Sequence, residues 1–117
     1  MRKLLLILFL SAVLGGTVGT AQARMWQSNS SWASWYGPGL YGNGLACGGI
    51  LTTSTWGVAH KSLPCGTRVH ICYIRCVVAT VIDRGPYVAG REFDLTGPVR
   101  YAIGMPGVGQ VRWWVGR

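Results

Sequence analysis

The sequence predicts an all-β protein: a small, six-stranded closed β-barrel with one short helix, stapled by disulfide bonds. Six short segments rich in β-branched and aromatic residues are separated by turns that contain glycine and proline. Only one segment has the boundaries of a helix. The chain has 117 residues, and 94 remain when an N-terminal export signal of 23 residues is removed. So few strands cannot cover two open sheets, whereas closing one sheet removes its exposed edges.

The first 23 residues have the pattern of a secretory signal peptide. Arg2 and Lys3 precede an apolar run over residues 4–14, and Ala21 and Ala23 form a small-x-small cleavage site. The run is shorter than the ~20 residues that a spanning helix needs. No cysteine follows the cleavage site to receive a lipid. We therefore expect a secreted, extracellular or wall-associated protein with no membrane anchor after cleavage.

The chain that remains is basic and contains few acids. It keeps nine Lys and Arg side chains and three acidic ones, which gives a formal charge of +6. The basic residues are scattered, without the run that is typical of a nucleic-acid-binding arm. For an exported protein this charge predicts an anionic surface or polymer as partner, and no nucleic acid. A contribution to solubility alone is the alternative.

Four cysteines, all in the exported part, predict disulfide bonds that help a domain of this size to fold. Cys72 and Cys76 flank three residues between two strands, so a hairpin can bring them within bonding distance. Cys47 and Cys65 would then close a longer loop. Four cysteines allow three pairings, and the sequence does not choose among them. A zinc site is the competing interpretation, although the spacings do not form two C-x-x-C pairs.

The barrel domain is expected over residues 32–117, after a flexible polar leader at residues 24–31. Its first strand is predicted at Trp32–Gly37, where large and small side chains alternate. A glycine-rich loop follows over residues 38–49. The other strands are predicted at residues 57–60, 68–73, 77–82, 92–95 and 111–115. The single helix is predicted to begin near Pro98 and to end at Gly104.

Asp83, Glu92 and Asp94 are the only side-chain carboxylates of the chain, and Asp83 is the leading candidate for chemistry. It follows an apolar strand and precedes Arg84-Gly85-Pro86, which turns the chain. The end of a strand that opens into a loop is where a rigid scaffold often presents functional groups. The alternative is structural, because an aspartate in this position can accept backbone N–H bonds and fix the turn.

Four segments in order resemble the rare lipoprotein A (RlpA-like) family. They are Ala33-Ser34-Trp35-Tyr36-Gly37, the stretch from Ala59-His60-Lys61 to Arg68-Val69, Val81-Ile82-Asp83-Arg84-Gly85-Pro86-Tyr87, and Phe93-Asp94-Leu95-Thr96. The resemblance covers the chain from about Ala33 to Val115. It implies a double-psi β-barrel, the fold of expansins and barwin-like proteins. It also implies lytic transglycosylase activity on peptidoglycan glycan strands, with formation of a 1,6-anhydro sugar.

The resemblance assigns roles to particular residues. Asp83 matches the aspartate of the family's Asp-Arg-Gly-Pro motif and would act as the catalytic acid and base, with His60 as a groove residue that orients a carboxyl or contacts the sugar. Many active members carry a glutamate in an Asn-Gly-Glu segment and an aspartate three residues later. Here Gly49 and Thr52 stand at those places, as in the cysteine-containing variants of the family.

Asp94 is a third catalytic candidate, because its segment resembles the His-Phe-Asp-Leu-Ser segment of expansins and related inverting glucanases. We expect Asp94 and Asp83 to face one groove. Glu92 is two residues from Asp94 on the same strand and is expected to be a solvated surface acid beside Arg91. His70, in an alternating strand, is expected at the surface.

Aromatic and basic side chains beside the loops are candidates for glycan binding, because flat rings stack on sugar faces and cations attract anionic groups of the wall. The candidates are Tyr36, Tyr41, Lys61, Arg84 and Tyr87. The alternatives are core packing for the tyrosines and simple solvation for the charged residues.

The sequence therefore predicts a secreted, monomeric barrel that acts on peptidoglycan as a lytic transglycosylase, with no cofactor and no metal. Two other functions stay open. One is a non-catalytic, expansin-like module that binds polysaccharide and loosens the wall. The other is a barwin-like secreted protease inhibitor.

Overall fold

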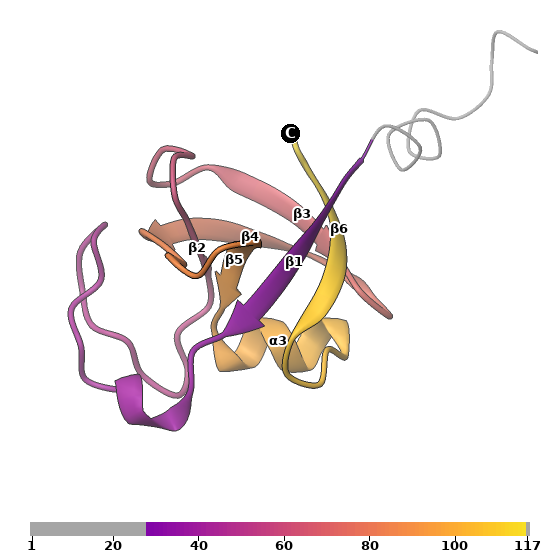
Figure 1. Ribbon diagram of the computed structural model, residues 1–117. Coiled ribbons are helices and arrows are strands. Elements are labelled where there is room, and N and C mark those ends of the chain that lie inside the picture. The colour runs from indigo at the N-terminus through magenta and orange to yellow at the C-terminus, as the bar shows by residue number, and fades with distance from the viewer. Residues whose placement is uncertain (1–27, 117) are drawn as a thin grey trace, which may run out of the picture.

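The computed structural model describes residues 28–116, which fold into a closed barrel of six strands with one α-helix (Figure 1). The signal peptide and most of the leader predicted from the sequence lie outside this range. The elements are β1 (Asn29–Trp35), the 3-10 turn η1 (Pro38–Leu40), β2 (Val58–His60), β3 (Arg68–Cys72), β4 (Cys76–Asp83), β5 (Arg91–Leu95), α3 (Gly97–Ile103) and β6 (Gly109–Val115).

Two parallel strand pairs connect the halves of the barrel. β1 pairs in parallel with β5, and β2 pairs in parallel with β4. The other four pairings are antiparallel and close the order β1-β5-β2-β4-β3-β6 into a ring. This is the double-psi barrel that the resemblance implied. Because all six strands lie between Asn29 and Val115, a chain that begins at Arg24 contains the complete barrel.

The barrel interior is a continuous apolar core. Alternate residues of every strand point inward, as the period of two requires. Burial of each large apolar side chain contributes roughly 1.5–3 kcal/mol. The largest fully buried core side chains are Phe93, Ile71, Leu95, Ile103, Met105, Val58, Val69, Val81, Val99 and Val111.

The elements agree with the predicted ones in type, and two boundaries are instructive. β1 begins at Asn29, three residues before the predicted start, because residues 29–31 pair with residues 111–113 of β6. Sequence alternation does not reveal such pairing of polar residues. In α3, Pro98 stands in the first turn and Gly104 adopts the left-handed conformation (φ 79°) that ends a helix. Among residues 28–116 no helix has the length and apolar character needed to cross a membrane.

Both disulfide pairs are those that the hairpin argument suggested. Cys72 bonds Cys76 across the β3–β4 hairpin, and Cys47 bonds Cys65 over a separation of 18 residues. All four cysteines are therefore oxidised in pairs, which removes the zinc interpretation. The second bond connects the long segment between β1 and β2 to the turn between β2 and β3.

Candidate functional site

Four neighbouring strands bring two of the three carboxylates to one outer face of the barrel. Ser34 of β1 is in register with Asp94 of β5, Asp94 with Ala59 of β2, and Ala59 with Asp83 of β4. Residues in register across adjacent strands point to the same face of a sheet. Two strand spacings of ~4.8 Å separate the two aspartate backbones by about 10 Å. Asp83 and Asp94 therefore share one face, as expected from the sequence.

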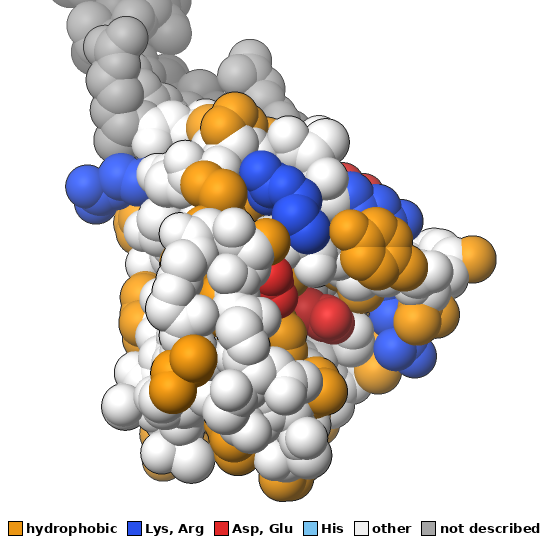
Figure 2. Space-filling view, turned by 90° about the vertical axis from the view of Figure 1, so that its left-hand side faces the viewer, with side chains coloured by type: hydrophobic (Ala, Val, Ile, Leu, Met, Phe, Trp, Pro, Cys, Tyr) orange, Lys and Arg blue, Asp and Glu red, His pale blue; other side chains and the backbone are white. Residues whose placement is uncertain are grey.

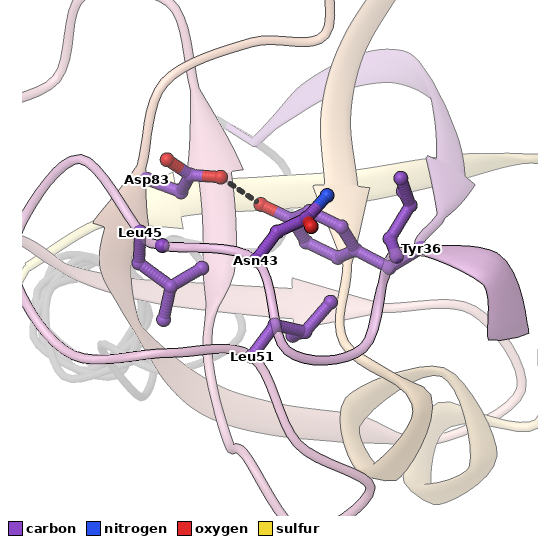
Figure 3. A pocket seen from close by; sticks show the side chains of 7 residues that line it. Tyr36, Asn43, Leu45, Leu51 and Asp83 are labelled. Atoms are coloured by element: carbon purple, nitrogen blue, oxygen red, sulfur yellow. Dashed lines mark hydrogen bonds between the residues drawn. The ribbon is translucent and has the colours of Figure 1, made fainter.

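The long segment between β1 and β2 covers part of this face and forms a pocket. A small apolar cluster of Tyr36, Leu51 and Ala59, with Tyr41 and Leu45 beside it, fixes the segment to the outside of the barrel. The pocket has a volume of about 190 Å³ (Figure 3). It is smaller than the roughly 300–1,000 Å³ of typical small-molecule sites. The residues that line it are Tyr36, Leu40, Asn43, Gly44, Leu45, Leu51 and Asp83.

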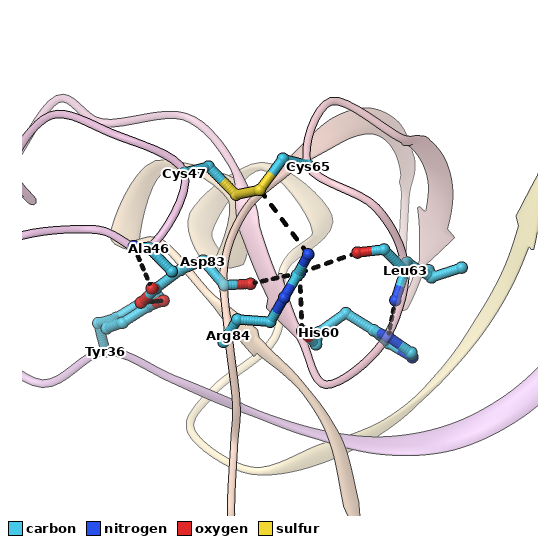
Figure 4. The surroundings of a disulfide bond; sticks show 8 residues. All are labelled: Tyr36, Ala46, Cys47, His60, Leu63, Cys65, Asp83 and Arg84. Carbon is cyan, nitrogen blue, oxygen red and sulfur yellow. Dashed lines mark hydrogen bonds between the residues drawn. A yellow bond between two sulfur atoms is a disulfide. The ribbon is translucent and has the colours of Figure 1, made fainter.

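Asp83 is held in the pocket by hydrogen bonds to both carboxylate oxygens. The Tyr36 hydroxyl donates to Oδ2 at 2.7 Å, and the backbone N–H of Ala46 donates to Oδ1 at 2.7 Å (Figures 3 and 4). Burial raises the pKa of the Tyr36 phenol well above its usual value, and the hydrogen bond and negative charge of Asp83 raise it further. Tyr36 therefore remains a hydrogen-bond donor across the physiological pH range.

Asp94 lies beside this pair and has a partner of its own. The Ser34 hydroxyl donates to its Oδ1. The negative charge of Asp94 also contributes to the raised pKa of Tyr36, which places the phenol in the field of both aspartates. Acidic side-chain atoms are visible close together near the middle of this face in Figure 2. This face therefore has two oriented carboxylates, Asp83 in the pocket and Asp94 bonded to Ser34, and both act on the Tyr36 phenol.

His60 does not line the pocket. Its ring is buried at the end of β2 and packs against Phe93 at 4.9 Å between ring centroids. Nδ1 accepts hydrogen bonds from the backbone N–H groups of Ser62 and Leu63, which places the ring proton on Nε2. Nε2 lies 2.6 Å from Oε2 of Glu92. Glu92, expected to be a solvated acid beside Arg91, thus has His60 as its partner.

The side chain of Arg84, the residue after β4, connects the end of β4 to the turn that follows β2. Its Nη1 donates to the carbonyl oxygens of Leu63 at 2.8 Å and His60 at 3.3 Å, and Nη2 lies 3.7 Å from Sγ of Cys65 (Figure 4). Since Cys65 is bonded to Cys47, the guanidinium supports the same junction as the disulfide. The contacts that Arg84 makes here are with the protein itself, and its predicted role in glycan binding stays a prediction.

The other predicted binding residues differ in exposure. Tyr87 is 80% exposed and Lys61 is exposed, so both are accessible to a large ligand. Tyr41 is half-buried against the apolar cluster. His70, expected at the surface, is half-buried, and its ring stacks on Trp114 with 4.9 Å between centroids. The reason is that the two residues are paired in register on β3 and β6.

Gly49 and Thr52, which the family resemblance matches to two acids of many active members, both belong to the local structure of the loop. Gly49 has φ 80°, a conformation that disfavours any residue with a side chain. Thr52 bonds the hydroxyl groups of Ser54 and Thr55 through its own Oγ1. Within residues 28–116 no group of three metal-binding side chains occurs.

Sequence reasoning did not identify Ser34 or the Ala46 N–H as part of the site. A signal for Ser34 existed, because it follows the inward-facing Ala33 in an alternating strand and must point outward. The Ala46 contact had no such signal, since it depends on how a glycine-rich loop folds over β4.

The barrel topology and the two aspartates on one outer face define the class of protein: a double-psi β-barrel with an acidic site on its surface. Comparison with known sequences then assigns the family. The profile of the family described as lytic transglycolase matches residues 29–113, which is most of the chain, so the protein belongs to that family. The double-psi architecture agrees with this assignment.

Individual relatives support the same assignment. The chain is 43% identical over 84 residues to a probable endolytic peptidoglycan transglycosylase RlpA of Synechocystis sp., a match that covers 68% of this chain and 26% of the relative. The chain thus spans about a quarter of that relative.

Two solved structures share the fold. An apo expansin of Clavibacter michiganensis has a TM-score of 0.60 and 21% identity, and a variant of that expansin in complex with cellohexaose has a TM-score of 0.60 and 20% identity. Each match covers 77% of this chain and 50% of the expansin chain.

Proposed function

We propose that this protein acts outside the cell membrane on the glycan strands of peptidoglycan, as a lytic transglycosylase that forms 1,6-anhydro sugars. The observation that carries the proposal is the position of Asp83, a carboxylate in a pocket with both oxygens oriented by hydrogen bonds. The family assignment and the names of the RlpA relatives support the same substrate.

Asp83 would serve as acid and then as base. Its protonated carboxyl gives a proton to the glycosidic oxygen, and the C1–O bond breaks with an oxocarbenium-like transition state. The carboxylate then takes the proton of the sugar's own 6-hydroxyl as that oxygen bonds to C1, so the proton returns to Asp83 and no water is consumed. One carboxyl is sufficient for both steps, which fits a chain with three acids.

The neighbouring residues would position the reacting group. Tyr36, with its raised pKa, keeps its proton and fixes one oxygen of Asp83, while the Ala46 N–H fixes the other. Asp94, at about two strand spacings, would hold sugar hydroxyl groups or the developing positive charge. Tyr87 and Lys61 are accessible for contacts with a strand that extends beyond the small pocket.

A second candidate is a non-catalytic module that binds polysaccharide. Two points favour it. The family resemblance matches Gly49 and Thr52 to positions where many active members carry acids. The fold also matches an expansin whose variant was solved with cellohexaose. In this case Asp83 and Asp94 would accept hydrogen bonds from sugar hydroxyl groups without proton transfer.

The two functions are separated by product analysis. The chain from Arg24 is incubated with purified peptidoglycan, and mass spectrometry is used to detect 1,6-anhydro products. We expect products from the wild type and a loss of about 10²-fold or more in rate for Asp83→Asn, because a positioned acid–base group contributes at least that much. Sedimentation with the wall should be retained, since the amide keeps the shape of the carboxyl.

Glu92→Gln is the matched control. It likewise replaces a carboxyl with an amide, but Glu92 contacts His60 and does not line the pocket. We expect this variant to form products. Absence of products with retained sedimentation of the wild type would support the binding module. Equal losses for Glu92→Gln and Asp83→Asn would transfer the catalytic role to the His60–Glu92 pair.

A further inference from the structure

An exposed apolar surface lies on the side of the barrel opposite the pocket. It consists of four side chains from the β3–β4 hairpin, α3 and the α3–β6 connection, here called the hairpin surface: Tyr73 (39% exposed), Ile74 (70%), Tyr101 (79%) and Val108 (48%). Figure 1 shows the hairpin and the long segment of the pocket projecting on opposite sides of the barrel. Neither the core nor the groove accounts for these residues.

Close contacts hold the hairpin surface together. The backbone N–H groups of Ile74 and Arg75 donate to the carbonyl oxygen of Ile103 at 2.9 and 3.2 Å. A Cβ atom on Gly104 would lie 3.2 Å from Cδ1 of Ile74. A Cβ atom on Gly109 would lie 2.8 Å from Cε1 of Tyr73. The two glycines therefore let the hairpin pack directly on the backbone, and its apolar side chains are presented by a fixed structure.

The charges around this surface are all positive. Arg75 lies in the hairpin and donates to the carbonyl oxygens of Ala102 and Tyr101 at the end of α3. Arg112 is exposed and in register with Cys72, the residue before Tyr73. Residues 68–76 and 97–117 contain no acid, and all three carboxylates of the chain lie at positions 83–94. Asp83 and Asp94, which share the face with the pocket, therefore lie away from this apolar and cationic surface.

We propose that the hairpin surface docks on the surface of an anionic lipid bilayer. Side chains that are 70–79% exposed stand out from the protein, whereas an anchor for a protein partner is usually set in a well-packed pocket. Tyrosine favours the membrane–water interface, and Ile and Val favour the acyl boundary. Exposed Arg112 at the rim can reach a lipid phosphate while its stem stays over apolar groups, and the charge of Arg75 adds to the positive field.

This contact is peripheral and reversible, in contrast to a lipid or helical anchor. It would turn the pocket away from the bilayer, toward polymer outside it. The inference depends on the hairpin surface alone, so it stands or falls separately from the proposed transglycosylase activity.

Vesicle sedimentation tests the proposal. The chain from Arg24 is mixed with vesicles of phosphatidylglycerol and phosphatidylcholine in equal parts, or of phosphatidylcholine alone. We expect binding to the anionic vesicles, with a steep decrease at high salt. Ile74→Asp should reduce the partition coefficient about tenfold, because it removes an inserted side chain and adds a like charge. Arg112→Gln should reduce it about fivefold, the contribution of one basic residue near the surface.

Ile50→Asp is the matched control: Ile50 is 59% exposed and lies in the segment on the opposite side of the barrel. Its binding should equal that of the wild type. Absence of binding to anionic vesicles, or equal losses for Ile74→Asp and Ile50→Asp, would overturn the proposal. So would concentration-dependent dimerisation that Ile74→Asp abolishes without any vesicle binding, because the surface would then be an interface between two copies of the chain.

Discussion

The barrel has two contrasting sides: the groove side, which has the pocket around Asp83, and the hairpin side, which has the hairpin surface. Different kinds of contact hold the two sides in place. On the groove side, a long segment with little regular structure is fixed by a disulfide, a few polar hydrogen bonds and a small apolar cluster. On the hairpin side, a three-residue loop packs directly on α3 and β6 at two glycines. The groove side has Asp83 and Asp94, and the charged groups beside the hairpin are Arg75 and Arg112.

The difference shows how a small domain can combine an adaptable site with a stable frame. Segments with few buried apolar contacts open locally at low free energy, whereas closely packed elements open only with the whole fold. We therefore expect perturbations of the groove side to act on the pocket first, and perturbations of the hairpin side to act on the barrel as a whole.

The largest effect is expected from removal of the Cys47–Cys65 disulfide by Cys47→Ser with Cys65→Ser. The bond closes a loop over a separation of 18 residues, so its loss should lower the free energy of unfolding by about 3 kcal/mol. Hydrogen exchange should increase most at the amides of residues 42–51. Denaturant unfolding and amide exchange give both quantities.

The control for this prediction is Cys72→Ser with Cys76→Ser, which opens a loop over a separation of only four residues. Its expected cost is lower, about 2 kcal/mol, and the pocket amides should keep their protection. If both double variants expose the pocket segment equally, the two sides are not independent and the comparison is wrong.

A smaller effect is expected from Gly109→Ala on the hairpin side. The new Cβ atom would lie 2.8 Å from Cε1 of Tyr73 and 3.0 Å from Cγ of Met105. Such overpacking should cost about 2 kcal/mol, measured as a lower midpoint in denaturant.

Gly107→Ala is the matched control, because a Cβ atom there meets nothing within 4 Å and the backbone does not have a positive φ. It should be neutral or slightly stabilising. Equal destabilisation by both variants would mean that the contact of Tyr73 with Gly109 is unimportant.

The smallest effect is expected from Tyr36→Phe, which removes the hydrogen bond to Asp83. This change should lower the free energy of unfolding by about 1.5 kcal/mol near neutral pH. The pKa of Tyr36 is raised in the folded protein above its unfolded value of 10.0. Its stabilisation is therefore complete below about pH 10 and is lost as the pH rises toward the folded value. The difference in free energy of unfolding between wild type and Tyr36→Phe should shrink as the pH rises above about 10, by up to about 1.4 kcal/mol per pH unit.

Tyr101→Phe provides the comparison, because Tyr101 is 79% exposed on the hairpin side. The free energy of unfolding of this variant should be close to that of the wild type, because the exposed hydroxyl has no protein partner to lose among the hydrogen bonds described for residues 28–116. A constant difference between Tyr36→Phe and wild type from neutral to alkaline pH would contradict the proposed environment of the phenol.

Much of the fold could be predicted from the sequence because local patterns determine it. The apolar run over residues 77–82 indicated β4, Pro98 and Gly104 indicated the ends of α3, and the spacing of Cys72 and Cys76 indicated a bonded hairpin. The start of β1 was missed, because Asn29 and its polar neighbours become a strand only through pairing with β6.

The site was predicted in part. Asp83 and Asp94 were expected to face one groove, and the register through Ala59 places both on one face of the sheet. Only Asp83 lines the pocket, so a shared groove stays a prediction. The position of His60 beside Phe93 and Glu92 was not evident, because the Ala-His-Lys segment does not reveal which way the ring points when β2 ends.

The sequence alone determined which groups are available: three side-chain carboxylates, four cysteines and a pattern of six short strands. These follow from composition and local periodicity, which need no knowledge of distant contacts. Only the tertiary structure decided that Tyr36 and Asp94 stand beside Asp83, that Glu92 pairs with His60, and that Tyr73, Ile74, Tyr101 and Val108 lie exposed on the hairpin side. The physical reason is that strand register and the docking of loops join residues far apart in the chain, and these are set by packing and closure of the whole barrel.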